Sequence, residues 1–185
     1  MNSRLLILAP AAGAIAALVA ACGAPVTTPA QTIPAKPAAA SHPAKAPRAA
    51  RTGDPITLKG TTAGETMRVT VVRVFKHARP ATSLDAAPAG QRLVAVQIRL
   101  TDTGTRPYRD SPSNGATVVD AKGESFQAAI SSVTGCPSFP GTEVIPVGAS
   151  GLGCVVFQVP AAAKIVGVQF TLDSGLGPVT GQWRV

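Results

Sequence analysis

Three cysteines offer the most specific chemistry in this chain of 185 residues: Cys22, Cys136 and Cys154. A cysteine can be acylated, can pair in a disulfide or can bind a metal ion. A zinc site takes about four ligands, and the part of the chain that holds Cys136 and Cys154 adds only one histidine, His77. The sequence therefore predicts no metal site and leaves acylation and disulfide formation as the expected chemistry.

Cys22 ends a segment that is organised like an export signal. Arg4 provides a positive charge, residues 5–18 form an apolar run, and Val19-Ala20-Ala21 precede the cysteine. This order resembles the lipobox of bacterial lipoproteins, which implies that residues 1–21 are a signal peptide and that Cys22 carries diacylglycerol as the mature N-terminus. Ordinary secretion is one alternative. A retained membrane-spanning helix is the other, because the segment reaches the low end of the roughly 17–25 residues that a span needs.

The other two cysteines are expected to pair with each other. Once Cys22 is assigned to the lipid, Cys136 and Cys154 remain as an even number in an exported, oxidising context. A disulfide between them would close a loop of about 18 residues and contribute about 3 kcal/mol of stability. Two buried free thiols are the alternative.

Catalytic arrangements are weakly supported. His77 is the only histidine of the domain that a serine-histidine-acid triad could use, and Leu152 stands where a nucleophile elbow at 148–152 needs its second glycine. Acidic pairs such as Asp102 with Asp110 lie in expected turns, where aspartate typically caps the backbone. No phosphate-binding loop or dinucleotide motif is present, so the sequence predicts neither an enzyme nor a cofactor.

Residues 22–52 are expected to be a lipid-anchored linker. The stretch is rich in proline and alanine, and it has too few large apolar residues for a core. It carries four basic residues and no acidic one, whereas the part from Gly53 onward carries twelve basic and nine acidic residues. The linker charges are expected to lie near anionic lipid head groups or cell-wall polymers, with solubility alone as an equal alternative. No nucleic-acid partner is expected, because the domain has no basic block.

Residues 53–185 suffice for one domain, and their pattern is typical of β-strands. Alternation is clearest in 91–101, and the apolar parity in 67–77 changes after Val71, which predicts a bulge or two covered faces. The expected strands are 56–59, 67–77, 91–101, 116–120, 125–130, 152–159, 165–172 and 179–185, with a hairpin turn at 121–123. The residues expected to face the core from the last two strands are Val166, Val168, Phe170, Leu172, Val179, Trp183 and Val185. The prediction is an all-β chain, an antiparallel β-sandwich of about eight strands.

Three stretches carry a family resemblance: PAGQRLVAVQIRLTDTG at 88–104, VDAKGESF at 119–126, and the part of 145–160 that runs from Ile-Pro-Val-Gly to Gln-Val-Pro. In this order they resemble the telokin-like, immunoglobulin-like domain of unknown function found in bacterial lipoproteins and secreted immunoprotective antigens. Asp102 stands where asparagine is commoner, and Val147 interrupts the usual Pro-Gly turn. The resemblance implies an immunoglobulin-like sandwich in an exported protein, and it implies no catalytic residues.

Two loops are candidate binding surfaces. Arg106, Tyr108 and Arg109 place the only tyrosine beside two arginines, and both residue types are enriched at interface hot spots. The alternative is an ordinary connection whose Tyr108 packs on the sandwich edge. A second loop, 134–144, could expose Phe139, unless the disulfide folds the loop back over the sheet.

The sequence as a whole predicts a binding or interaction module that Cys22 anchors to the extracytoplasmic face of the cell membrane. Its partner would be an envelope protein or a cell-wall component. The alternative is a structural or assembly factor that acts within a membrane protein complex. A hydrolase is the third hypothesis.

Overall fold

The structure is a computed structural model that describes residues 50–185. The expected signal peptide at 1–21, the acylation site Cys22 and the linker up to residue 49 lie outside the described residues. Within the described range no helix is long and apolar enough to cross a membrane.

The described chain forms two main sheets and a short ribbon. One sheet has the order β1-β11-β10-β6-β7, the other has the order β2-β3-β4-β9, and β5 pairs with β8 alone. The strands are β1 (Ala50–Arg51), β2 (Pro55–Lys59), β3 (Thr66–Ala78), β4 (Gln91–Asp102), β5 (Tyr108–Asp110), β6 (Ala116–Asp120), β7 (Ser125–Gln127), β8 (Glu143–Ile145), β9 (Ser150–Pro160), β10 (Ile165–Thr171) and β11 (Thr180–Arg184). One helical turn, α1 (Pro112–Gly115), and two 3-10 turns (Ser83–Asp85 and Asp173–Gly175) complete the elements.

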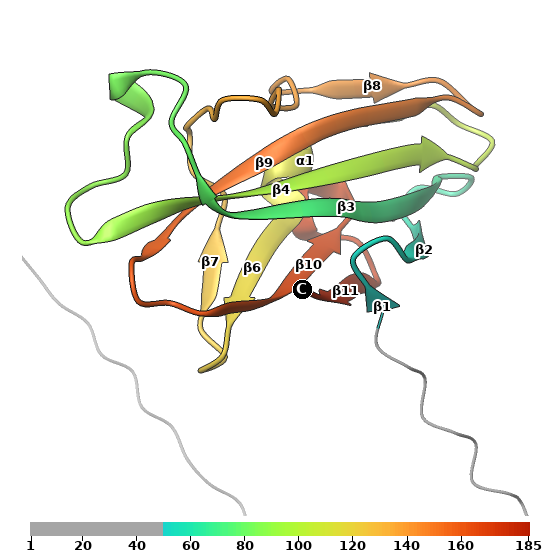
Figure 1. Cartoon of the computed structure of the whole chain (residues 1–185). Coiled ribbons are helices and arrows are strands. Elements are labelled where there is room, and N and C mark those ends of the chain that lie inside the picture. Colours follow the sequence, from blue (N-terminus) through green and yellow to red (C-terminus); the bar gives the residue numbers. More distant parts are fainter. Residues whose placement is uncertain (1–49) are drawn as a thin grey trace, which may run out of the picture. The chain divides into compact units, whose positions relative to one another are not determined.

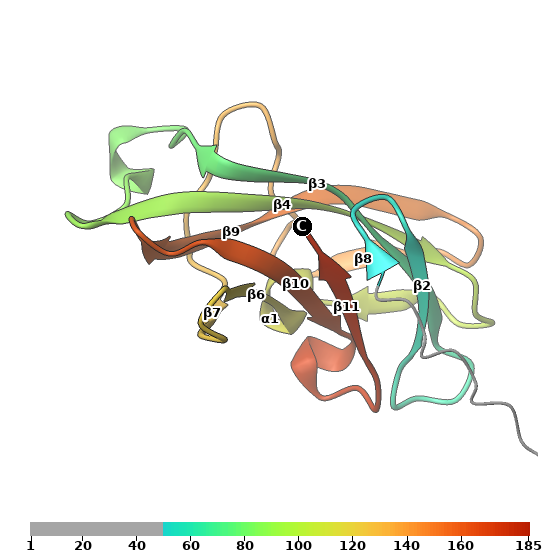
Figure 2. The same cartoon turned by 60° about the horizontal axis from the view of Figure 1, so that its bottom comes forward.

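The two main sheets pack as the layers of a sandwich. Figures 1 and 2 show β3, β4 and β9 in one layer and β6, β10 and β11 in the other. Every strand pair except the parallel β1–β11 pair is antiparallel, so the prediction of an all-β antiparallel sandwich is confirmed. Each of the eight expected strands is present. β1, β5 and β8 are additional, and β1 begins before the expected domain boundary at Gly53.

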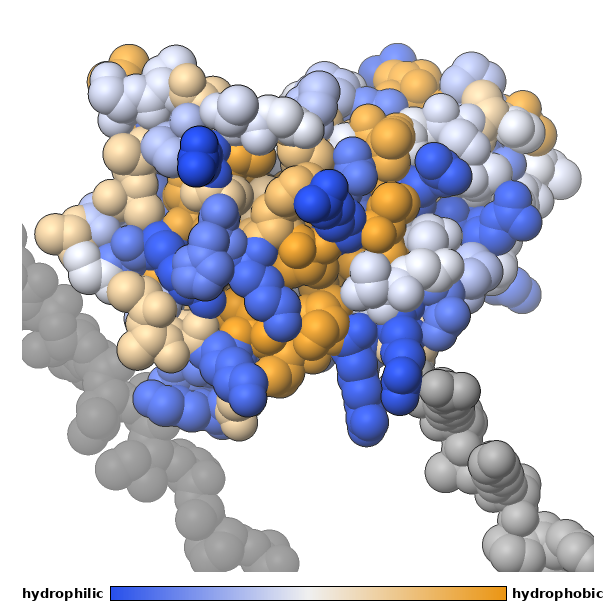
Figure 3. Space-filling model, viewed as in Figure 1, coloured by the Kyte–Doolittle hydropathy of each residue, from blue (hydrophilic) through white to orange (hydrophobic). Residues whose placement is uncertain are grey.

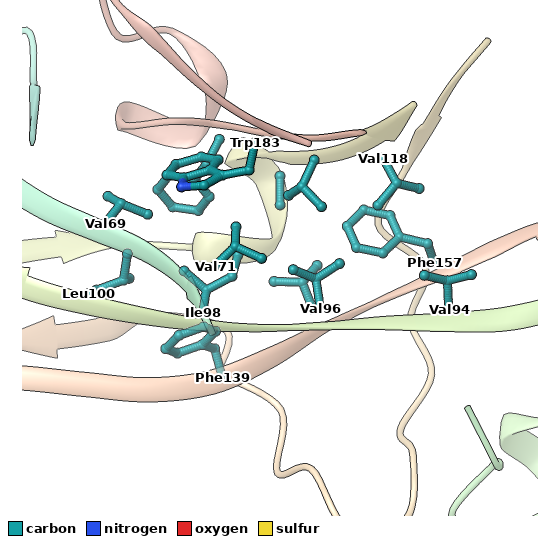
Figure 4. Packing of buried hydrophobic residues seen from close by; sticks show 14 of the residues in the cluster. Val69, Val71, Val94, Val96, Ile98, Leu100, Val118, Phe139, Phe157 and Trp183 are labelled. Carbon is teal, nitrogen blue, oxygen red and sulfur yellow. The ribbon is translucent and has the colours of Figure 1, made fainter. Parts of the chain in front are cut away.

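The main core lies between the layers. Val94, Val96, Ile98 and Leu100 of β4 are fully buried, as their alternation predicts, and each buried side chain of this size contributes roughly 1.5–3 kcal/mol. Trp183 from β11 reaches into the same core (Figure 4). Its indole Nε1–H donates to the carbonyl of Asp54 at 2.8 Å, which satisfies the one polar atom that the ring brings inside.

Two bulges change which residues face this core. The predicted bulge in 67–77 is confirmed, because the β3–β4 register shifts between Val71 and Arg73. A second shift, between Ile165 and Gly167 in the β10–β6 pair, was not predicted. It buries Ile165 and leaves Val166 36% exposed, so the expectation that Val166 faces the core was wrong. Val179 was also expected inside, but it precedes β11 and is 50% exposed.

A smaller core covers the outer face of the β2-β3-β4-β9 sheet. Leu93 and Ala95 of β4 and Cys154 and Val156 of β9 point to this face, and residues 133–136 cover them. The structure contains the predicted disulfide between Cys136 and Cys154, with Cα atoms 5.8 Å apart. Because both faces of β9 are covered, both sets of its alternating residues are buried.

Candidate binding site

Asp102 organises the loop that carries the predicted binding residues. Its side chain is 1% exposed, and its carboxylate accepts hydrogen bonds from the backbone N–H groups of Gly104 at 2.9 Å and Tyr108 at 3.0 Å. The backbone of Asp102 is also hydrogen-bonded to the turn before β9: its N–H donates to the carbonyl of Ala149, and its carbonyl accepts from the N–H of Gly148. Asp102 is therefore a turn-capping aspartate, as the sequence predicts, and it fixes the path of residues 103–108.

Tyr108 is a core residue, so its assignment to a binding surface was wrong. Its side chain is fully buried among the residues of the main core. The cause is β5, which was not foreseen: it pairs with β8 and turns Tyr108 inward and Arg109 outward. The alternative considered from the sequence, in which the ring packs on the sandwich edge, describes the structure better.

The phenol group of Tyr108 is left without a partner. Its oxygen is the one buried side-chain polar atom that makes no hydrogen bond within residues 50–185. Burial raises the pKa of Tyr108 far above its usual range, and the negative charges of Asp110 and Glu65 raise it further. The phenol thus stays protonated beneath a cluster of carboxylates.

Arg106 and Arg109 remain at the surface, as predicted. Both are exposed and line a polar hollow of about 160 Å³, together with Glu65, Asp173 and two further residues, Thr62 and Pro107. Three segments that are far apart in the sequence form this hollow. We call it the arginine pocket.

Carboxylates lie beside the two arginines. Burial raises the pKa of Glu65 above its usual value, and the charge and hydrogen bond of Asp173 raise it further, while Arg106 lowers it. Asp173 accepts a hydrogen bond from the backbone N–H of Thr61 at 2.6 Å. A proton on Glu65 therefore relieves the repulsion between two neighbouring carboxyl groups.

The wall that contains Asp173 has a strained backbone. Asp173 and Ser174 have φ angles of 54° and 52°, in the left-handed region that non-glycine residues rarely adopt. Asp110 supports this conformation, since its carboxylate accepts hydrogen bonds from the Ser174 N–H at 2.7 Å and the Ser174 hydroxyl at 2.6 Å. Such strain persists only where surrounding contacts fix it, and it is concentrated at functional sites.

Phe139 does not form part of an exposed surface. It is 8% exposed, and its ring packs on Gly153, where a Cβ atom would lie 2.7 Å from the ring. The loop is folded back over β9 by the disulfide and by a hydrogen bond from Cys154 N to Pro137 O at 2.8 Å. The expectation that the loop exposes Phe139 was therefore wrong, and the alternative, in which the disulfide folds the loop back over the sheet, describes the structure.

The residues considered for a catalytic triad lie apart in the fold. Ser150, the serine of the elbow-like segment, shares a hydrogen bond of 2.7 Å with Thr101, whereas His77 lies at the opposite end of β3 and β4. Asp120, like Asp102, caps a turn by accepting from the N–H groups of Lys122 and Glu124. Residues 50–185 contain no group of three or more histidine, cysteine or acidic side chains that could hold a metal ion.

Comparison with known proteins supports the fold. The domain is similar to MPT63, a secreted protein from Mycobacterium tuberculosis, with a TM-score of 0.52 and 13% identity over 74% of this chain and 96% of that one. It is also similar to ycdA, a candidate lipoprotein from Bacillus subtilis, with a TM-score of 0.50 and 15% identity over 67% of this chain and 38% of that one. No family model matches the chain, so membership of the telokin-like family stays a prediction. No curated protein matches its sequence.

Proposed function

We propose that this protein is a lipid-anchored binding module on the extracytoplasmic face of the cell membrane, and that it contacts an envelope protein through the arginine pocket. The observation that carries the proposal is the alternation of exposed Arg106 and Arg109 around the fully buried Tyr108. Arginine is enriched at the energetic centres of interfaces, and its planar guanidinium group pairs with carboxylates through two parallel hydrogen bonds.

The loop is suited to recognition because its backbone is fixed before a partner binds. The Asp102 carboxylate holds residues 104 and 108, and β5 is paired with β8. A loop that is already ordered loses less conformational entropy on binding than a mobile one. Arg106 and Arg109 therefore supply directed charges at a small ordering cost.

The location is supported by the sequence before the domain and by the disulfide. Arg4, the apolar run and Cys22 have the order of a lipoprotein signal. Disulfides are typical of oxidising compartments outside the cytoplasm. The two proteins of similar fold are described as secreted and as a candidate lipoprotein.

Mass spectrometry of the native protein, extracted from membranes in detergent, tests the anchor. We expect a chain that begins at a lipid-modified Cys22 and gains two hydrogen atoms when the Cys136–Cys154 disulfide is reduced. A Cys22→Ser variant should lose the lipid mass and leave the membrane fraction. A chain that begins at Met1 with an unmodified Cys22 would contradict the proposal.

Photocrosslinking in living cells tests the arginine pocket. A photoreactive amino acid replaces Thr105, which is exposed beside Arg106, or replaces Gln127 on β7 as the control. We expect one discrete adduct from position 105, lost on Arg106→Ala with Arg109→Ala, and none from position 127. Equal adducts from both positions would contradict the proposal that the arginine pocket binds the partner. An adduct at position 105 that persists in the variant without both arginines would also contradict it.

A further inference from the structure

A second hollow lies at the end of the sandwich opposite the arginine pocket. It has a volume of about 320 Å³ and lies between the end of β3, the start of β4 and the turn from β9 to β10. Lys76, His77, Arg92 and Lys164 line it, and the rest of its wall is Ala161, Ala162, Ala163 and Ile165. None of its lining side chains is acidic, so we call it the basic pocket.

Arg92 is the fixed element of the basic pocket. Its guanidinium donates to the carbonyl of Ala163 at 2.6 Å, to that of Ala161 at 3.3 Å, and to that of Lys76. These bonds tie the end of β3 to the turn after β9. A guanidinium group has five N–H donors, so two remain for a ligand.

The charge of Arg92 is not balanced by a carboxylate. Burial is the cause that lowers the pKa of Arg92, with no acidic neighbour acting in the opposite direction. Asp120 is an acidic residue in a turn next to Lys164. A hydrogen bond from the backbone N–H of Ala121 to the carbonyl of Lys164 joins this turn to Lys164. The Asp120 carboxylate faces its own turn, where it accepts from the N–H groups of Lys122 and Glu124.

Space for a ligand comes from the small residues at 161–163, which cover the wall without filling it. Lys76 lies on β3 and Lys164 in the turn from β9 to β10, and both side chains are exposed. The face in Figure 3 shows hydrophilic side chains gathered over the gap between β3 and the start of β10, beside an apolar area in the middle of the face. A hollow lined by two lysines and an arginine, with no acidic side chain, attracts a multiply charged anion.

We propose that the basic pocket binds a phosphate group, with the free N–H donors of Arg92 and the ammonium groups of Lys76 and Lys164 contacting the phosphate oxygens. Arginine and lysine are the usual partners of phosphate: the guanidinium fork binds two oxygens, and the ammonium acts as a compact point charge. The phosphate belongs either to a soluble phosphate ester or to an anionic phospholipid head group. This site lies at the far end of the domain and does not depend on the function proposed for Arg106 and Arg109.

The test measures how fast each lysine of the full-length protein, extracted from membranes in neutral detergent, is acylated by an amine reagent. Glycerol 3-phosphate is the soluble probe, and phosphatidylglycerol vesicles are compared with phosphatidylcholine vesicles. We expect at least threefold slower acylation of Lys76 and Lys164, with Lys59, at the other end of the sheet, unchanged as the internal control. Protection by glycerol 3-phosphate indicates a soluble ligand, and protection by phosphatidylglycerol vesicles alone indicates a lipid head group. Protection in neither arm, or equal protection of Lys59, would overturn the proposal.

Two pocket variants and one control variant link the protection to the pocket. Lys76→Gln with Lys164→Gln removes two exposed charges and should weaken binding of the effective probe at least tenfold, measured by isothermal titration calorimetry. Lys59→Gln with Arg68→Gln removes the same charge at the other end of the sheet and should leave binding within twofold. Arg92→Lys keeps the charge but cannot reproduce the three carbonyl contacts, so it should weaken binding while Trp183 fluorescence shows a folded domain. Equal affinity in the pocket and control variants would refute the site.

Discussion

The carboxylate of Asp102 accepts a hydrogen bond from the backbone N–H of Tyr108 at 3.0 Å, and both residues are almost completely shielded from solvent. This bond connects the end of β4 to the start of β5, across the loop that carries Arg106. The loop at residues 103–107 is thus attached at both ends to buried residues. Substitutions of these buried residues should therefore also change the position of Arg106 at the surface.

Asp102→Ala should destabilise the domain strongly. The change leaves the partly buried N–H group of Gly104 and the buried N–H group of Tyr108 without an acceptor, and the loss for a buried group costs roughly 1–3 kcal/mol. We expect the free energy of unfolding to fall by about 2–4 kcal/mol in urea titrations. Ser125→Ala, on an exposed position of β7, is the control and should change it by less than about 0.5 kcal/mol. An equally small effect of Asp102→Ala would mean that water replaces the carboxylate.

Tyr108→Phe should be neutral or slightly stabilising. The phenol oxygen is buried without a hydrogen bond, so its removal relieves a desolvation cost of about 1 kcal/mol and leaves the ring packing intact. Tyr108→Ala, in contrast, should lower the free energy of unfolding by about 3–5 kcal/mol, because it opens a cavity in the core. Both values can be measured by urea denaturation. A loss above about 1 kcal/mol in Tyr108→Phe would reveal a bonding partner for the phenol.

Removal of the disulfide should destabilise the domain without preventing folding. Cys136 and Cys154 are separated by 18 residues, and closure of a loop of this length contributes about 3 kcal/mol. Cys136→Ala with Cys154→Ala suits these buried sites better than serine, because alanine introduces no polar group. We expect a lower urea midpoint that no longer responds to reductant, whereas the wild type should respond. Identical midpoints for the wild type with and without reductant would show that the disulfide contributes nothing.

Alternation of apolar residues predicted the long strands because a half-buried strand imposes it directly. Val94 to Leu100 follow it without interruption, and β4 lies where the sequence predicts. β5 and β8 have three residues each, too few for any periodicity, and their pairing reverses the expected position of Tyr108. The inward turn of Ile165 in place of Val166 depends on a bulge that local pattern does not signal.

The candidate sites were predicted less well because they are assembled from distant segments. Arg106 and Arg109 stand out by type, but Glu65 and Asp173 join them only through the fold: Thr61 and Asp173, which are hydrogen-bonded, lie 112 residues apart. The basic pocket is similar, since Lys76, Arg92 and Lys164 belong to three separate elements. Their meeting follows from strand pairing, which a pattern of residue types cannot specify.

The pair of Glu65 and Asp173 should make stability depend on pH. Burial and the charge of Asp173 raise the pKa of Glu65 above its ordinary value of 4.5. A carboxyl group with a higher pKa in the folded protein contributes stability that is complete below the unfolded pKa and is lost as the pH rises through the folded pKa. Glu65→Gln cannot ionise, so its free energy of unfolding should rise relative to that of the wild type as the pH increases from about 4 to about 7.

The measurement is a series of urea titrations across this pH range, with the variant compared to the wild type at each pH so that all other titrating groups cancel. Asp85 must cancel in this way, because hydrogen bonds from Thr82 and Ser132 lower its pKa and give it the opposite dependence. Glu124→Gln makes the same change on an exposed side chain and corrects for the altered net charge. The opposite result would be a free energy of unfolding of Glu65→Gln that falls relative to that of the wild type as the pH rises. It would mean that the fold stabilises Glu65 as a carboxylate, held charged beside Arg106.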